Sequence, residues 1–386
     1  MLRSLHIQNF KCLRDTTLEL GPFTVLIGPN DSGKTRILDA LRLLGQTFVR
    51  PWSEVFTEVN QGNALMWRRE LGEIHWHLKF QDTQDTLEYR FAYPSGKERG
   101  VSTRNGTFER IDGEQLNVSG PTGTTQRINP LRLKPFATGL QTIREPQMRL
   151  PIQAELQRFT DALAELPRYR LDPDALRTPA VPQPDAVLTP SGDNLVAVLD
   201  RLISGPDRSA IVELERNLHA AIPTLRGISL RTADGKTGAK TLEFVLAGPG
   251  KSLTTIPCAH ASDGAMLLTA FLALAYSEQP GLLLIEEPEN GLHPSRLRAV
   301  VEMLRKLSTG EVGPRPRQVI LTTHSPLLLN FTEPDEVRIV RRDPETGTQI
   351  TPLSAVPDID KLLAEFGVGE LWYLLGEDDL VTGKKP

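Results

Sequence analysis

The sequence predicts an α/β fold with a buried, mainly parallel core sheet, and three observations lead to this prediction. Residues 23–27 form a short apolar run that precedes a glycine-containing loop and a helical pattern. Residues 281–285 form a second apolar run, residues 317–323 have the pattern of another buried strand, and polar or charged residues follow each of them directly. Continuous apolar runs of this length are typical of parallel strands that are buried on both faces. Strands of this kind combined with helical patterns place the chain in the α/β class.

The N-terminal elements can be predicted in order from hydrophobic periodicity. Residues 5–10 alternate between apolar and polar, which indicates a half-buried strand, and residues 23–27 indicate a fully buried one. Apolar residues then recur at helical spacing within residues 34–44, so a helix follows the loop. The resulting order is strand, loop and helix.

The middle of the chain changes character twice. Residues 75–80 and 87–93 alternate as strands and predict an antiparallel sheet at the N-terminal side. Residues 151–177, 194–202 and 211–221 are helical in pattern, and the proline-rich residues 178–191 indicate a linker or an extended arm. Strand-like alternation returns at residues 226–246. We therefore expect an N-terminal lobe (1–150), a helical insertion with its proline-rich segment (151–225) and a C-terminal lobe (226–386).

Composition excludes some classes of protein and leaves others open. The 386 residues include only two cysteines, Cys12 and Cys258, so a disulfide framework is not expected. No apolar run approaches the roughly 20 residues that a membrane helix needs, and the N-terminus does not resemble a signal peptide. These features predict a cytoplasmic protein with no membrane partner. A net charge of −4 leaves nucleic-acid binding undecided, because it says nothing about local basic patches.

Residues 28–35, Gly-Pro-Asn-Asp-Ser-Gly-Lys-Thr, match the G-x-x-x-x-G-K-[ST] phosphate-loop pattern. The pattern lies between the predicted strand and helix, which is the context that such a loop requires. Its glycines let backbone N–H groups surround phosphate oxygens, Lys34 reaches the β- and γ-oxygens, and Thr35 can ligate Mg²⁺. We therefore expect ATP and Mg²⁺ as cofactors. The residues expected to bind the nucleotide here are Gly28, Pro29, Asn30, Asp31, Ser32, Gly33, Lys34, Thr35 and Arg36.

Two adjacent glutamates, Glu286 and Glu287, follow the apolar run at residues 281–285. Ligands of doubly wound sheets collect beyond the carboxyl ends of the strands, so these acids are expected at the phosphate site. Successive strand residues face opposite ways, which gives the two acids different roles. We assign Glu286 to Mg²⁺ and Glu287 to the attacking water. The alternative is a solvated acidic turn.

Two further residues are candidates because of their positions beside predicted elements. His324 follows the predicted strand at residues 317–323, where it is either structural or a contact for the γ-phosphate. Ser262, Asp263 and Gly264 precede an apolar helical pattern at residues 265–276. A serine there is either a helix N-cap or part of an anion site.

Taken in order, residues 28–35, 262–264, 282–294 and 321–326 resemble the ABC-type ATPase heads of the SMC, RecF-like and OLD-like group. The string Glu-Glu-Pro-Glu-Asn-Gly-Leu-His-Pro at 286–294 is similar to that of stand-alone AAA-family ATPases. The resemblance implies a P-loop NTPase with an ABC-type head. It also implies an ATP-dependent, head-to-tail homodimer in which Ser262 senses the γ-phosphate in trans, Asn290 communicates across the dimer and His324 is the switch histidine. Catalysis would then involve Glu287, His324 and Lys34.

The sequence departs from the pattern of the group at several places. The signature reads Ala-Ser-Asp-Gly-Ala, and the first acid is Glu286 where such enzymes commonly carry aspartate. The lid glutamine has two candidates, Gln141 and Gln147. Only 62 residues (325–386) follow His324, so no C-terminal nuclease module of the OLD type is expected.

Two biological roles remain open at this point. In the first, dimer closure grips duplex DNA in repair or in defence against foreign DNA. In the second, the ATPase gates a separate effector protein, such as a nuclease or a toxin. We find no second catalytic motif in this sequence, which favours the second role. A transporter motor is a third, weaker reading. Basic residues that could contact DNA are Arg68, Arg69, Arg127, Arg132, Lys134, Arg144 and Arg149.

Overall fold

The computed structural model divides the chain into two compact units. The first contains residues 1–166, 280–282 and 333–386, and the second contains residues 167–279 and 283–332. The predicted divisions at residues 150 and 225 remain predictions. The structure describes residues 1–58, 62–69, 72–81, 86–95, 97–102, 106–111, 115–119, 125–128, 153–164, 166–206, 208–233, 238–248, 252–277 and 281–382.

An eight-stranded antiparallel sheet belongs to the first unit, with the order β2-β1-β4-β5-β6-β7-β8-β9. It confirms the predicted N-terminal antiparallel sheet and extends it beyond residue 93. The alternation that predicted strands is real, since Ile74, Trp76 and Leu78 of one strand are buried. The strands are β1 (Leu2–Phe10), β2 (Leu13–Glu19), β4 (Ile74–Gln81), β5 (Thr86–Tyr93), β6 (Glu98–Ser102), β7 (Gly106–Ile111), β8 (Gln115–Ser119) and β9 (Thr125–Ile128).

Helix α1 (Lys34–Gln46) packs against this sheet through its apolar face. The indole Nε1 of Trp76 donates a 3.2 Å hydrogen bond to the Ala40 carbonyl, which joins β4 to the helix. Gly45 lets α4 approach, because a Cβ there would lie 2.0 Å from the Leu163 carbonyl oxygen. The neighbouring helices are α2 (Trp52–Glu58), η1 (Gly62–Leu65), η2 (Trp67–Arg69) and α4 (Gln153–Leu163).

Six strands make up the mainly parallel core sheet, three from each unit, which confirms the predicted fold class. In the first unit, β3 (Phe23–Ile27) pairs in parallel with β16 (Val337–Asp343), which pairs antiparallel with β17 (Gly347–Pro352). In the second, the order is β10 (Arg168–Tyr169), β14 (Leu282–Glu286) and β15 (Gln318–Thr323), with β10 and β14 parallel. Every residue of β3, β14 and β15 is buried, which confirms the three predicted buried strands.

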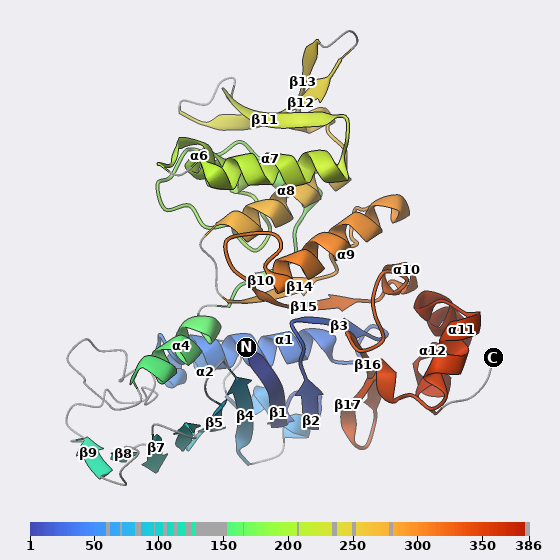
Figure 1. Cartoon of the computed structure of the whole chain (residues 1–386). Coiled ribbons are helices and arrows are strands. Elements are labelled where there is room, and N and C mark those ends of the chain that lie inside the picture. Colours follow the sequence, from blue (N-terminus) through green and yellow to red (C-terminus); the bar gives the residue numbers. More distant parts are fainter. Residues whose placement is uncertain are drawn as a thin grey trace. The chain divides into compact units, whose positions relative to one another are not determined.

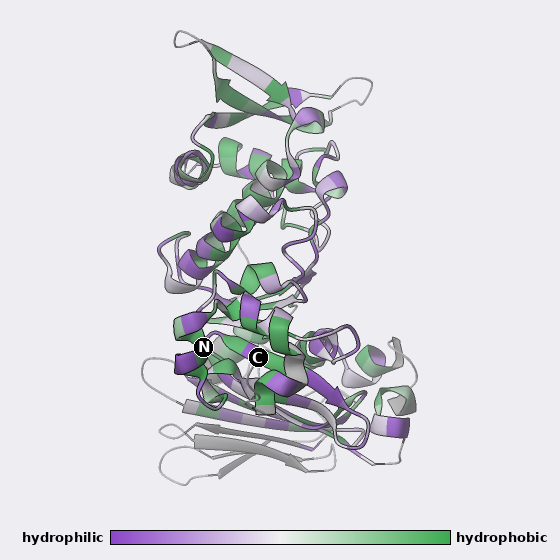
Figure 2. Ribbon diagram, turned by 90° about the vertical axis from the view of Figure 1, so that its right-hand side faces the viewer, coloured by the Kyte–Doolittle hydropathy of each residue, from purple (hydrophilic) through white to green (hydrophobic). Residues whose placement is uncertain are grey.

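A three-stranded antiparallel sheet, β11 (Leu225–Thr232), β12 (Lys240–Ala247) and β13 (Leu253–Pro257), belongs to the second unit. Helices α6 (Leu195–Ser204) and α7 (Ser209–Ala221) lie between this sheet and the buried, apolar helix α8 (Asp263–Tyr276) (Figure 1). The hydropathy colouring shows hydrophobic residues along the strands of this sheet, at the top of Figure 2. The remaining elements of this unit are α5 (Pro173–Leu176), η5 (Cys258–His260), α9 (Pro294–Thr309) and α10 (Pro326–Leu329).

A buried arginine holds the end of α8. Arg317 precedes β15, is 1% exposed and donates hydrogen bonds of 2.6 and 2.5 Å to the carbonyl oxygens of Leu274 and Ser277. These carbonyls belong to the last turn of the helix and its C-cap, where intrahelical donors are missing. Burial lowers the pKa of Arg317 to about 10, so the guanidinium remains charged at neutral pH.

The proline-rich residues 178–191 form an extended segment that is tied to the second unit. Ala180 and Lys240 exchange two backbone hydrogen bonds of 3.1 and 2.9 Å. The Asn194 side chain donates to the Val187 carbonyl and accepts from the Thr189 amide. The segment therefore packs as an arm rather than hanging free as a linker.

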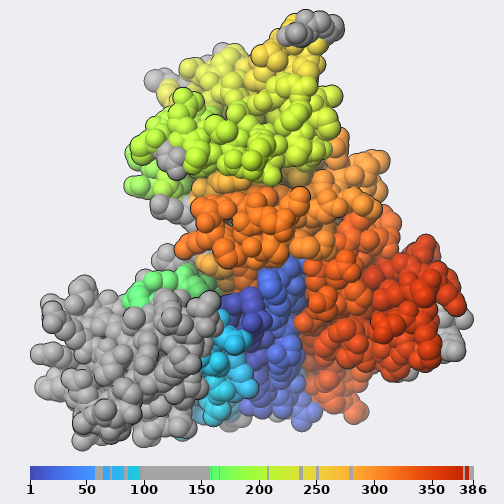
Figure 3. Space-filling view, viewed as in Figure 1, coloured from blue at the N-terminus to red at the C-terminus, as the bar shows by residue number. Residues whose placement is uncertain are grey.

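The C-terminal elements of the first unit are η6 (Leu353–Ala355), α11 (Ile359–Glu365) and α12 (Val368–Thr382). The two α-helices, coloured red in Figure 3, lie on the face that this view shows. Tyr373 of α12 is 83% exposed, whereas Leu371 and Leu380 are buried. No helix in the described part of the chain is long and apolar enough to cross a membrane.

Candidate functional site

The phosphate loop occupies the turn between β3 and α1, in the first unit. Neither of its two glycines leaves room for a side chain. A Cβ at Gly28 would lie 2.0 Å from the Val340 carbonyl oxygen of β16. Gly33 has a φ of 108°, in the left-handed region that favours glycine, and a Cβ there would lie 2.4 Å from Thr348 Oγ1. The loop therefore lies directly against the backbone and side chains of β16 and β17.

Thr348 of β17 supports the loop from behind. Its hydroxyl donates a 2.9 Å hydrogen bond to the Ser32 carbonyl, and its amide donates a 2.9 Å bond to the Cys12 carbonyl. Thr348 is fully buried. Sequence reasoning missed this residue, because nothing in the local pattern of β17 reveals which strand position faces a loop more than 300 residues away.

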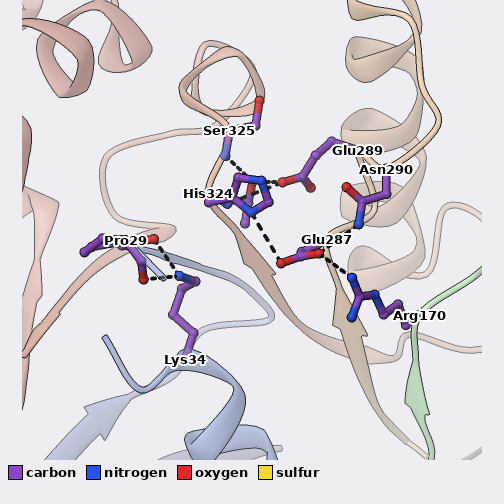
Figure 4. A network of polar contacts seen from close by, with 10 residues as sticks. Pro29, Lys34, Arg170, Glu287, Glu289, Asn290, His324 and Ser325 are labelled. Carbon is purple, nitrogen blue, oxygen red and sulfur yellow. Dashed lines mark hydrogen bonds and ion pairs between the residues drawn. The ribbon is translucent and has the colours of Figure 1, made fainter. Parts of the chain in front are cut away.

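Lys34 folds back over the loop. Its ammonium group donates to the carbonyl oxygens of Gly28 at 2.5 Å and Pro29 at 2.8 Å, so it is held above the turn (Figure 4). Thr35 is half-buried, while Pro29, Asn30 and Asp31 are exposed and Arg36 forms a 2.9 Å ion pair with Asp39. The hydroxyl of Ser32 is buried without a hydrogen-bond partner in the described structure. This arrangement of amides, ammonium and hydroxyls fits a bound phosphate chain.

A separate group of predicted residues belongs to the second unit, where β14 ends. Glu286 is buried, its Oε2 lies 3.3 Å from Arg168 Nε, and its Oε1 has no hydrogen-bond partner among the described residues. A buried carboxylate oxygen without a partner is costly unless a ligand satisfies it. Glu286 therefore fits the role of a Mg²⁺ ligand, since Mg²⁺ prefers one or two carboxylates together with phosphate oxygens.

Glu287 is the centre of a polar cluster that Figure 4 shows. Its φ of 46° is unusual for a residue with a side chain, and its amide donates to the Thr322 carbonyl at 2.8 Å. Oε2 accepts from Arg170 at 3.1 Å and from Asn290 Nδ2 at 2.8 Å. Oε1 lies 3.3 Å from Nδ1 of His324. The structure thus brings Glu287, Asn290 and His324 together, and adds Arg170, which sequence reasoning did not single out.

Glu289 is a third residue that the sequence analysis missed, after Thr348 and Arg170. Its Oε1 accepts from the Thr323 hydroxyl at 2.5 Å and from the His324 amide at 3.3 Å, and the Ser325 amide in turn donates to Thr323 Oγ1. Burial raises the pKa of the Glu289 carboxyl above its usual value, although the Thr323 hydrogen bond opposes this shift. Glu289 therefore anchors the backbone turn that carries His324.

The signature segment lies at the start of α8. Ser262 is the N-cap, and its Oγ accepts a 3.3 Å hydrogen bond from the Ala265 amide, which confirms the capping interpretation. Asp263 accepts a 2.6 Å ion-pair hydrogen bond from Arg177. A Cβ at Gly264 would lie 3.3 Å from Arg296 Cγ, so α9 packs closely here. A role for Ser262 in trans remains a prediction.

Several predicted residues lie outside the described part of the chain. They are the two candidates for the lid glutamine and most of the candidate DNA contacts, namely Gln141, Gln147, Arg132, Lys134, Arg144 and Arg149, together with the side chain of Arg127. Arg68 and Arg69 are described. Arg68 stacks on Trp67 and donates to the Pro344 carbonyl, which is a structural contact.

Comparison with protein families gives one match that covers most of the chain. Residues 23–330 match the model described as "AAA domain, putative AbiEii toxin, Type IV TA system". The chain belongs to this AAA-domain family. The supports of the phosphate loop on β16 and β17 lie beyond the matched residues.

Two curated relatives of this AAA-domain chain are nucleases by name. The OLD nuclease of Thermus scotoductus (strain ATCC 700910 / SA-01) is 26% identical over 371 residues, which cover 89% of this chain and 62% of the relative. The Old nuclease of Escherichia phage P2 is 22% identical over 367 residues, which cover 85% of this chain and 57% of the relative. The chain thus spans about three fifths of the length of these relatives.

Solved structures identify the fold of this AAA-domain chain as that of SMC heads. The SMC head domain from Thermotoga maritima matches with a TM-score of 0.51 and 13% identity, covering 91% of this chain and 98% of that one. An SMC head bound to the C-terminal winged-helix domain of ScpA matches with a TM-score of 0.55 and 14% identity. This match covers 91% of this chain and 97% of that one. At this level of identity the likeness concerns the fold alone.

Proposed function

We propose that the chain binds MgATP on residues 28–36 and hydrolyses it. The observation that carries this proposal is the phosphate loop itself, in which Gly28 and Gly33 leave no space for side chains and Lys34 is held over the turn. Loops of this geometry at a strand-to-helix turn bind phosphates through backbone amides and the helix N-terminus. Membership of the AAA-domain family agrees with this proposal.

Each residue of the proposed site has a chemical role. Lys34 binds the β- and γ-phosphate oxygens, and Thr35 and Glu286 would hold Mg²⁺, which supplies positive charge to the phosphates during hydrolysis. Glu287 orients the attacking water and accepts its proton. His324 binds the γ-phosphate. Glu289 positions His324 through its hydrogen bonds to the Thr323 hydroxyl and the His324 amide.

Steady-state ATP hydrolysis tests the proposal directly. Glu287→Gln should bind ATP but lose turnover, whereas Lys34→Ala should lose both binding and turnover. Glu302→Gln serves as a control, since Glu302 is a half-exposed glutamate on α9 that pairs with Arg298. If Glu287→Gln hydrolyses ATP at the rate of the parent, the assignment of the catalytic acid is wrong.

We further propose that turnover requires a head-to-tail homodimer in which Ser262 and Asn290 reach the partner's nucleotide. The SMC-head fold supports this proposal, and light scattering with ATP tests it. Ser262→Gly is the informative variant, because glycine is a tolerated N-cap and the variant lacks the hydroxymethyl side chain that would reach the partner's nucleotide. We expect this variant to bind ATP and fail to dimerise. A Ser262→Gly protein that still dimerises with ATP would rule out the trans role.

The biological role follows one of two alternatives. The nuclease relatives support action on duplex DNA, in repair or in defence against foreign DNA. The toxin in the family description supports the alternative, in which the ATPase controls a separate effector protein. Stimulation of ATP turnover by duplex DNA, lost with rising salt, supports the first. Unchanged turnover with DNA, together with co-purification of an effector, supports the second.

A further inference from the structure

Arg170 connects the edge strand β10 to the predicted catalytic acid. The Arg170 amide donates a 2.9 Å hydrogen bond to the Pro190 carbonyl of the proline-rich arm, so its backbone is fixed. β10 runs parallel to β14, with Tyr169 opposite Ile285. Arg170 directly follows Tyr169, and Glu286 directly follows Ile285. From this position the guanidinium reaches Glu287 Oε2 at 3.1 Å, while the side chain remains 64% exposed.

The hydrogen bonds of Glu287 leave little of its carboxylate available for water. A carboxylate oxygen has about two acceptor sites, and Oε2 already receives one hydrogen bond from Arg170 and one from Asn290. Oε1 faces the imidazole of His324. Three residues proposed to act on ATP or across the dimer are therefore engaged with one another, as Figure 4 shows.

We propose that Arg170 is a positioning residue that holds Glu287 in a resting arrangement and must release it before water can be activated at full rate. This inference rests on the proposed ATPase function and adds a regulatory contact to the same site. The ion pair is suited to reversible release, because exposed pairs are weakly stabilising and are screened by salt. The left-handed backbone of Glu287 stores strain, which favours a change of conformation once the side chain is freed.

Arg170→Gln tests this proposal, with kcat measured at saturating MgATP. Release of Glu287 should raise kcat by about two- to fivefold, the range expected for breaking an exposed ion pair. Arg170→Lys keeps the charge and should remain close to the parent. Arg216→Gln is the matched control, because Arg216 is 70% exposed and pairs with Glu213 on α7. Moderate salt should raise kcat of the parent and leave the Arg170→Gln protein unchanged, which a purely structural role would not produce.

An Arg170→Gln protein with kcat equal to or below that of the parent overturns the proposal. The proposed ATPase function is wrong, independently of the role of Arg170, if neither the parent nor Arg170→Gln hydrolyses ATP, or if Glu287→Gln keeps full turnover. In that case, hydrogen exchange of the peptide containing residues 286–290 in the nucleotide-free proteins tests whether Arg170 restrains Glu287. Faster exchange in Arg170→Gln supports the restraint, and equal exchange excludes it.

Discussion

The hydroxyl of Thr348 donates a 2.9 Å hydrogen bond to the carbonyl of Ser32, although 316 residues separate them. The contact joins the antiparallel edge strand of the first unit to the loop that is proposed to bind phosphate. A phosphate loop must present its amides in one conformation before the ligand arrives, since ordering it on binding would weaken affinity. Thr348 supplies part of that order.

Removal of the Thr348 hydroxyl should therefore weaken nucleotide binding. Thr348→Val has nearly the same shape and leaves the buried Ser32 carbonyl unpaired, which costs about 1 kcal/mol, or about fivefold in the Kd for ATP. Thr348→Ser keeps the hydroxyl and should bind nearly as well as the parent. Calorimetric titration with ATP measures both, and equal affinity of the valine and serine variants would contradict this account.

Gly28 should tolerate no side chain. The Cβ of Gly28→Ala would meet the backbone oxygen of Val340 at 2.0 Å, and backbone can yield only by moving β16 or the loop. We expect loss of ATP binding, together with a lower melting temperature. Gly21→Ala is the comparison, because its Cβ would lie at an ordinary 3.5 Å from the Phe23 carbonyl. Similar behaviour of the two alanine variants would show that the loop has more room than described.

Arg317 should stabilise the folded protein, although its charge is buried, because its guanidinium donates to two carbonyl oxygens at the end of α8. Arg317→Met retains much of the volume but removes the guanidinium donors to the carbonyls of Leu274 and Ser277, and each lost hydrogen bond costs about 1–3 kcal/mol. Relief of the buried charge offsets part of this, so we expect destabilisation of about 2–3 kcal/mol in urea unfolding. Arg315→Met, at an exposed neighbour, should change stability by less than about 0.5 kcal/mol. A fully stable Arg317→Met protein would mean that water replaces the guanidinium.

Glu289 should make stability depend on pH. Because burial raises the pKa of this carboxyl, the folded protein retains a proton over a pH window in which the unfolded chain has lost it. The free energy of unfolding of the parent therefore falls as pH rises from the ordinary glutamate pKa through the raised one. Glu289→Gln carries no such proton, and glutamine can still accept from Thr323.

Melting temperatures of the parent and Glu289→Gln, measured from acidic to neutral pH, test this expectation. The variant should gain stability relative to the parent as pH increases. A difference between the two proteins that stays constant with pH would show that Glu289 titrates alike in the folded and unfolded states.

Local patterns predicted much of the fold and part of the site. Strands β3, β14 and β15 are buried throughout, as the sequence predicts, and the glycine pattern locates the phosphate loop. The contact between Glu287 and Asn290 lies within a single motif, so their closeness follows from their short separation along the chain. Their roles on ATP, like that of His324, remain predictions.

The supporting residues could not be predicted, because their positions depend on which strands become neighbours. Arg170 follows a strand of only two residues, too short for any periodicity. Thr348 is one of several polar residues in β17, and only the pairing of β17 with β16 brings it to the loop. Glu289 lies within a motif, but its anchoring of Thr323 requires the adjacent ends of β14 and β15.

The late position of β16 and β17 in the chain has a consequence for how the protein is made. On the ribosome, residues 28–35 are made long before Val340 and Thr348, which lie against Gly28 and Gly33 and follow them by more than 300 residues. Domains fold as their segments become available during synthesis. A nascent chain therefore cannot complete the supports of residues 28–35 until β16 and β17 have been made, so this loop should remain without its final packing over most of the intervening synthesis.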